Sequence, residues 1–106
     1  MKKHTVFLSP LAEKKLDLLL EYLAKNWGDP SKLKYINKLR EVTNQISIHP
    51  NSCQESKEMK GIFKCIITKQ SSFFYRILLD EIEIITFFDN RQNQKSIFEE
   101  LKEQLQ

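Results

Sequence analysis

Residues 62–88 read IFKCIITKQSSFFYRILLDEIEIITFF, and the architecture of the chain follows from this stretch. It contains three runs dense in isoleucine, phenylalanine and tyrosine, at 62–69, 72–79 and 82–88, with short polar breaks between them. β-branched and aromatic residues favour strands, and connections as short as these join antiparallel neighbours. We therefore predict a three-stranded antiparallel meander.

A strand at 3–8 and an amphipathic helix are predicted at the start of the chain. Ser9 followed by Pro10 begins the helix, because the serine oxygen can accept a bond from a free amide and proline has no amide to leave unpaired. Gly28 is a typical residue at a helix end. The apolar stripe expected to face the core comprises Ala12, Leu16, Leu19, Leu20, Leu23 and Trp27.

A second helix is predicted to start at Asp29-Pro30 and to end at His49-Pro50, because the residue before a proline avoids helical geometry. The Gly-Asp-Pro turn between the helices makes them an antiparallel hairpin. The stripe of the second helix comprises Tyr35, Ile36, Leu39, Val42 and Ile46.

The remaining segments complete the fold prediction. Residues 51–60 are polar and without periodicity, which indicates a loop, and 89–95 are polar again. At 96–106 apolar residues recur among acidic ones and predict a short terminal helix, carried by Ile97, Phe98, Leu101 and Leu105. Helices on one face of a mainly antiparallel sheet define an α+β sandwich, and 106 residues suit a single domain over 1–106.

The predicted sheet is apolar on both faces. Strict alternation puts Ile82, Ile84 and Phe88 on one face and Ile85 and Phe87 on the other. A two-helix hairpin covers one face only, and a bare apolar face in water is unfavourable. The second face is therefore covered by the C-terminal tail, by a segment of a partner protein, or by a second copy of the chain.

Composition excludes several classes of protein. The formal charge of +3 permits contact with an acidic surface without requiring it. The only cysteines, Cys53 and Cys65, have neither disulfide-framework nor zinc-site spacing, so we expect reduced thiols and no metal. No run is long enough for a secretory signal or a membrane span, so a cytoplasmic protein without membrane contact is expected.

The ordered set of local motifs resembles the RelE/ParE superfamily of type II toxins over residues 4–93, with its N-terminal strand, helical hairpin and meander. The motifs that carry the resemblance are Leu8-Ser9-Pro10-Leu11-Ala12-Glu13, Ile48-His49-Pro50, Met59-Lys60-Gly61-Ile62-Phe63-Lys64, Phe74-Tyr75-Arg76-Ile77 and Ile84 through Asn93 (IITFFDNRQN). RelE-like members cut messenger RNA in the ribosomal decoding site, and ParE-like members poison DNA gyrase. The fold alone does not choose between these activities.

The resemblance implies a candidate catalytic set. Cleavage at a 2′-hydroxyl needs a base and several cations that converge on one phosphate. The candidates are Lys64, Arg76 and Arg91, with Lys60 and Lys69 as further cations.

Several positions depart from the active ribonucleases. This chain has Ser71-Ser72 in place of an arginine, Cys65-Ile66 in place of a basic pair, and Asp89-Asn90-Arg91 where such members often carry histidine or tyrosine. The catalytic set is incomplete, which favours a ParE-like gyrase inhibitor. The alternatives are a RelE-like ribosome-dependent endoribonuclease and an inactive binding module.

An inhibitor that acts by contact needs a surface and no cofactor. The residues predicted to contact the target or the antitoxin are Lys60, Lys64, Arg76, Asp89, Asn90 and Arg91. The Asp89-to-Asn93 segment is alternatively a surface turn that ends the sheet. The expected partners are a cognate antitoxin, DNA gyrase or the ribosome with its mRNA, and a second copy in a homodimer.

Overall fold

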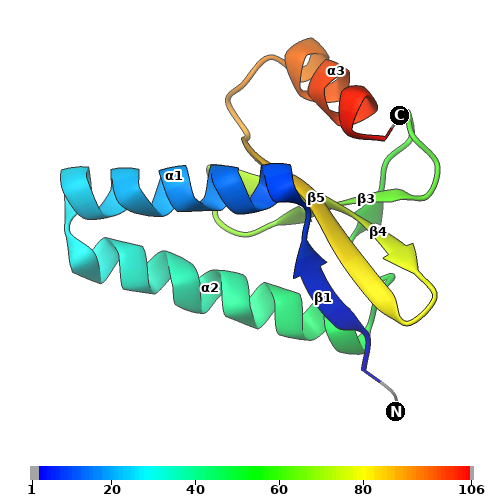
Figure 1. The fold of residues 1–106 in the computed structure, drawn as a ribbon, viewed down its shortest axis with the longest axis horizontal. Helices are drawn as coiled ribbons and strands as arrows, with labels where there is room; N and C mark the ends of the chain where they lie inside the picture. The colour runs from blue at the N-terminus through cyan, green and yellow to red at the C-terminus, as the bar shows by residue number, and fades with distance from the viewer. Residues whose placement is uncertain (1–2, 106) are drawn as a thin grey trace.

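A computed structural model describes residues 3–105 of the chain as a helical hairpin, a mixed sheet and a C-terminal helix (Figure 1). The elements are β1 (Thr5–Leu8), α1 (Pro10–Trp27), α2 (Asp29–Ile48), β2 (Gln54–Glu55), β3 (Ile62–Ile66), β4 (Ser71–Leu78), β5 (Glu81–Asp89) and α3 (Gln94–Gln104). The predicted α+β class and the order of its elements are confirmed.

The sheet has five strands in the order β1-β5-β4-β3-β2. The meander β3-β4-β5 is antiparallel as predicted, and β1 pairs in parallel with β5. The prediction of a plain loop at 51–60 was wrong at Gln54 and Glu55, which pair with Lys64 and Phe63 of β3. Two polar residues carry no periodicity, so this pairing is visible only in three dimensions.

Local capping fixes the ends of the helices as the sequence indicated. The Ser9 hydroxyl accepts a bond from the Ala12 amide at 3.0 Å and donates one to the Ile85 carbonyl at 2.6 Å, which ties the start of α1 to β5. Gly28 stands between the helices with a φ of 91°, a backbone conformation that glycine adopts at little cost. The hairpin therefore begins and turns at positions set by local chemistry.

The hairpin covers one face of the sheet and forms the larger core with it. Its buried members are Ala12, Tyr35, Ile46, Cys65, Ile67, Phe73, Tyr75, Ile82, Ile84 and Phe87. The expected alternation was wrong on β5, where Phe87 faces the hairpin and Phe88 the opposite side. A register shift between β4 and β5 at Phe74/Tyr75 leaves Ile85 without a direct partner, and such a bulge reverses the facing of the residues beyond it.

The chain's own tail covers the second face. In Figure 1, α3 lies across the sheet from the hairpin. A second core joins it to the strands through Ile62, Phe74, Ile85, Phe88, Ile97 and Leu101. Glu100 attaches α3 to α1 and to β5. Its carboxylate pairs with the Lys15 ammonium and accepts a bond from the Thr86 hydroxyl at 3.0 Å. Of the three occupants considered from the sequence, the structure places the tail there, so a bare face no longer argues for a partner.

The expectation of reduced thiols was wrong, since Cys53 and Cys65 form a disulfide with their Cα atoms 5.3 Å apart. Cys53 directly precedes β2 and Cys65 lies in β3, so the β2–β3 pairing brings the two sulfurs together. Their separation of 12 residues showed no such proximity in the sequence.

Candidate functional site

The end of β5 and the turn after it hold three of the predicted contact residues in one compact arrangement. The Arg91 guanidinium donates to both oxygens of the Asp89 carboxylate, at 3.0 and 2.8 Å, and the Arg91 amide donates to the same group at 2.8 Å. These hydrogen bonds lower the pKa of Asp89 below its ordinary value of 3.8, and the same carboxylate raises the pKa of Arg91. Both groups are therefore charged at neutral pH and form an ion pair at the surface.

Asn90 acts inside the molecule. Its side-chain oxygen accepts a bond from the Ser72 hydroxyl at 2.6 Å, and its side-chain amide donates to the Lys69 carbonyl at 3.0 Å. The Asn90 backbone amide donates to the Gln70 carbonyl at 2.8 Å. Asn90 thus clamps the end of β5 to the β3–β4 turn, and it positions the Asp89–Arg91 pair.

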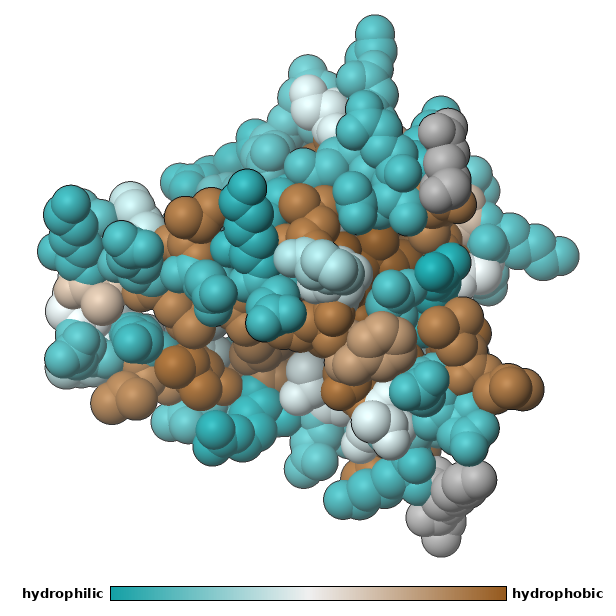
Figure 2. Space-filling model, viewed as in Figure 1, coloured by the Kyte–Doolittle hydropathy of each residue, from teal (hydrophilic) through white to brown (hydrophobic). Residues whose placement is uncertain are grey.

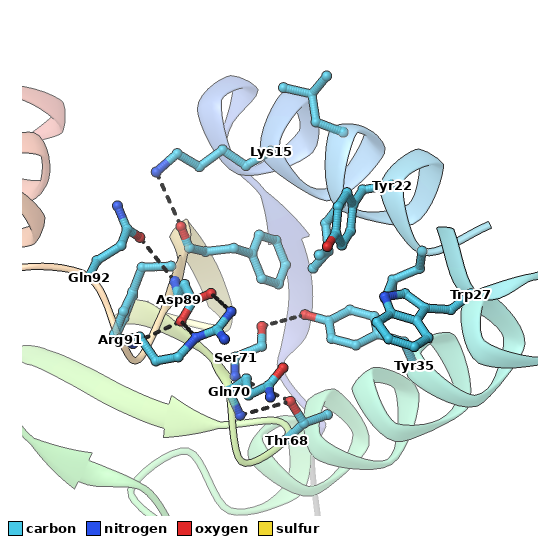
Figure 3. Close-up of a pocket in the computed structure, with 15 residues that line it drawn as sticks. Lys15, Tyr22, Trp27, Tyr35, Thr68, Gln70, Ser71, Asp89, Arg91 and Gln92 are labelled. Atoms are coloured by element: carbon cyan, nitrogen blue, oxygen red, sulfur yellow. Dashed lines mark hydrogen bonds and ion pairs between the residues drawn. The ribbon is translucent and has the colours of Figure 1, made fainter. Parts of the chain in front are cut away.

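The clamped turn borders a groove of about 510 Å³ between α1 and the end of β5. Figure 3 shows Arg91 and Asp89 on one side of it and Tyr22 and Trp27 on the other. The apolar part of the lining consists of Leu18, Leu19, Tyr22, Leu23, Trp27, Phe87 and Phe88. Leu18, Tyr22 and Trp27 are all more than half exposed, so this groove presents large apolar side chains to water.

Trp27 was wrongly assigned to the buried stripe of the first helix. It is 68% exposed, because α1 extends past the sheet at its C-terminal end (Figure 1). In Figure 2, hydrophobic patches lie among hydrophilic side chains over this end of the hairpin. A helical stripe predicts which face is apolar and does not predict where the covering sheet stops.

The floor of the groove is held by a buried hydrogen bond. The Tyr35 hydroxyl and the Ser71 hydroxyl lie 2.8 Å apart, and burial raises the pKa of Tyr35 (Figure 3). Lys15 closes one end of the groove, with its ammonium 3.2 Å from the Phe87 carbonyl. Sequence reasoning missed Leu18, Tyr22 and Lys15. Leu18 and Tyr22 are apolar residues that stand four positions apart and outside the predicted core stripe. This second apolar spacing on the same helix was the signal that could have identified them.

Lys64 and Arg76 lie on the face of the sheet that α3 packs against. Their cross-strand partners, Phe74 and Ile62, both belong to the second core, and paired residues point to the same face. The Lys64 ammonium lies 5.6 Å from the centre of the Phe88 ring. The Arg76 guanidinium donates to Glu83 at 2.6 Å.

The predicted cations are therefore distributed over separate surfaces. Arg91 lines the groove beside α1, Lys64 lines a hollow beside α3, and Lys60 is exposed in the turn before β3. Arg76 and Arg91 are each held by a carboxylate of the chain itself. This arrangement does not gather positive charge on one phosphate.

Two titratable groups near the groove have shifted pKa values. A lowered pKa makes Asp89 a poorer proton acceptor, and the raised pKa of Tyr35 keeps its hydroxyl protonated. Within residues 3–105 no three histidine, cysteine or acidic side chains are grouped to hold a metal ion. None of the helices in this part of the chain is long and apolar enough to cross a membrane.

Solved structures share this fold. A chain of the chromosomal ParDE toxin-antitoxin system from P. aeruginosa superposes with a TM-score of 0.68 at 15% identity, over 84% of this chain and 98% of that one. The E. coli DinJ-YafQ toxin-antitoxin complex gives 0.57 at 12% identity, over 82% and 92%. The YoeB dimer from Staphylococcus aureus gives 0.55 at 16% identity, over 85% and 99%. Identities this low show the fold alone.

This fold is shared with chains of type II toxin-antitoxin systems. The family model described as the ParE toxin of the type II toxin-antitoxin system parDE matches residues 6–94, most of the chain. The chain therefore belongs to the ParE toxin family. No curated protein matches its sequence.

Proposed function

We propose that this ParE-family toxin inhibits DNA gyrase by binding to it and that a cognate antitoxin neutralises it. The observation that carries the proposal is the dispersal of the candidate cations. Arg91 is paired with Asp89 at the groove, while Arg76 is paired with Glu83 on the opposite surface. A ribonuclease of the RelE type needs such groups to converge on one phosphate, whereas an inhibitor that acts by contact does not.

The groove beside α1 is the proposed antitoxin site. The second face of the sheet is already occupied by α3. At the groove, by contrast, Leu18, Tyr22 and Trp27 are apolar side chains that remain exposed to water. An amphipathic helix from the antitoxin fits a groove of this kind. We expect Tyr22→Ala to weaken antitoxin binding by about tenfold or more, because aromatic residues in apolar grooves contribute most to such interfaces.

The mode of action is tested with the purified toxin in two parallel reactions. Inhibition of gyrase supercoiling on a relaxed plasmid supports the proposal. Cleavage of messenger RNA on translating ribosomes, with supercoiling unaffected, contradicts it and supports the RelE-like alternative. Healthy growth of cells at verified expression supports an inactive module instead.

The contact surface is tested by a matched pair of variants. Arg91→Ala is expected to reduce toxicity, because Arg91 is an exposed cation in the turn that is predicted to contact the target. Lys25→Ala removes a cation from an exposed position in the last turn of α1 and is expected to leave toxicity unchanged. Equal toxicity of the two variants counts against the Asp89–Arg91 turn as a contact site. Their expression and thermal unfolding are measured alongside, so that a folding defect is recognised.

A further inference from the structure

The turn between β4 and β5 contains a leucine whose backbone conformation and exposure to water are both unusual for this residue type. Among residues 3–105, Leu79 is the only non-glycine residue with a positive φ, at 43°. Its side chain is also 95% exposed. Glycine, asparagine and aspartate are the residues that tolerate a left-handed backbone in a two-residue hairpin loop, and a leucine there also leaves its apolar surface in water. Such an outlier on a well-formed scaffold points to a function.

The tip that carries Leu79 is firmly held. Leu78 pairs with Glu81 across the hairpin, and the Thr5 amide donates to the Asp80 carbonyl at 3.0 Å, which joins the tip to β1. In Figure 2 hydrophobic side chains protrude at the corner where Figure 1 places this turn. An apolar side chain on a rigid support loses little conformational freedom on binding, which favours a strong contact.

Other exposed apolar residues differ from Leu79. Leu18, Tyr22 and Trp27 border the groove already described, and Leu33 lies on the regular backbone of α2. None of these positions carries a backbone penalty. The tip is therefore a separate surface, at the end of β5 opposite to the groove.

The chemistry of the tip selects the kind of partner. Glu81, which pairs with Leu78 across the hairpin, places an exposed acidic side chain beside the two leucines. Carboxylates next to an apolar projection disfavour the phosphate backbone of RNA or DNA and favour an apolar protein pocket with basic side chains at its rim. The groove of a second copy does not offer such a rim, because its cations Lys15 and Arg91 are already paired with Glu100 and Asp89.

We propose that the Leu78–Leu79 tip is a contact that this toxin inserts into an apolar, basic-rimmed pocket of its protein target. The assignment rests on the proposed function, in which the toxin acts by binding a protein. It adds the point of contact and the chemistry of the complementary pocket. Leu79 holds its costly conformation because the target requires the side chain, not because the fold does.

The test uses a variant that improves the fold and removes the contact. Leu79→Asn places a residue that tolerates positive φ at the tip, so the Tm is expected to rise by roughly 2–4 °C. The same variant is expected to need about ten times more protein, or more, for half-inhibition of supercoiling by purified gyrase. Leu33→Gln is the matched control, because it removes an exposed leucine from a regular helix, and it should inhibit like the wild type.

The outcomes separate this inference from the proposed function. A wild-type protein that does not inhibit gyrase overturns both. A wild-type protein that inhibits, with Leu79→Asn equally potent, overturns the tip assignment alone. If Leu79→Asn keeps its potency but loses antitoxin binding or self-association, the tip serves that other partner and the assignment is wrong. A fall in Tm contradicts the argument from backbone strain.

Discussion

The docking of α3 onto the sheet can be tested by shortening one side chain, Leu101→Ala. Leu101 is fully buried and, with Ile97, forms the part of α3 that enters the second core. An isolated helix of 11 residues is marginal in water, so α3 depends on this packing. Shortening a buried leucine to alanine costs about 2–5 kcal/mol. We expect that loss to detach α3 before it unfolds the rest of the chain.

The expected size of the effect follows from that cost. The lower end, about 2 kcal/mol, multiplies the fraction of molecules with α3 open by roughly 30. Hydrogen exchange of the amides in Gln94–Gln104 is the appropriate assay, because it reports local opening separately from global unfolding. Those amides should exchange roughly 30 times faster or more, while amides of α2 keep their protection. Detachment also uncovers Phe74 and Phe88, so the variant should bind a hydrophobic dye.

Glu103→Ala is the control on the same helix, since Glu103 is exposed. It should leave the exchange of α3 and the dye signal as they are in the wild type. If Leu101→Ala gives the same exchange profile as Glu103→Ala, α3 is not held in place by its buried leucine. If protection is lost equally over the whole chain, α3 unfolds with the rest and is not a separately detachable cover.

Three further outcomes are expected. Asn90→Ala should weaken toxicity and raise hydrogen exchange in the β3–β4 turn, because it removes the clamp between that turn and β5, and unchanged exchange contradicts this role. In an NMR titration the Asp89 carboxyl should titrate below 3.8 and move up toward that value in Arg91→Ala. Because its folded-state pKa is depressed, the pairing is complete at neutral pH and is lost as the pH falls through that lowered pKa; an identical titration in both proteins refutes the pairing. Cys53→Ser, or reduction of the bond to Cys65, should lower the free energy of unfolding by about 2–3 kcal/mol in a urea titration, since a short loop is released, and an unchanged midpoint contradicts a stabilising disulfide.

Local signals in the sequence determined the elements and the class of fold. The Ser9-Pro10 cap and Gly28 set the bounds of α1, because a cap is a contact between residues a few positions apart. The alternation of large apolar residues identified β3, β4 and β5. Together with the motif resemblance, these patterns identified the toxin superfamily, which the family match over residues 6–94 confirmed.

Only the tertiary structure decided how the candidate site is arranged. The sequence selected the Asp89–Arg91 segment, but the role of Asn90 depends on Ser72 and Lys69, which are distant in sequence. The same holds for the position of α3, the exposure of Trp27 at the groove and the Cys53–Cys65 bond. Each depends on which surfaces meet after the strands pair, and one β-bulge is enough to exchange the facing of Phe87 and Phe88. Periodicity along the chain indicates which faces are apolar, and packing between distant segments determines what covers them.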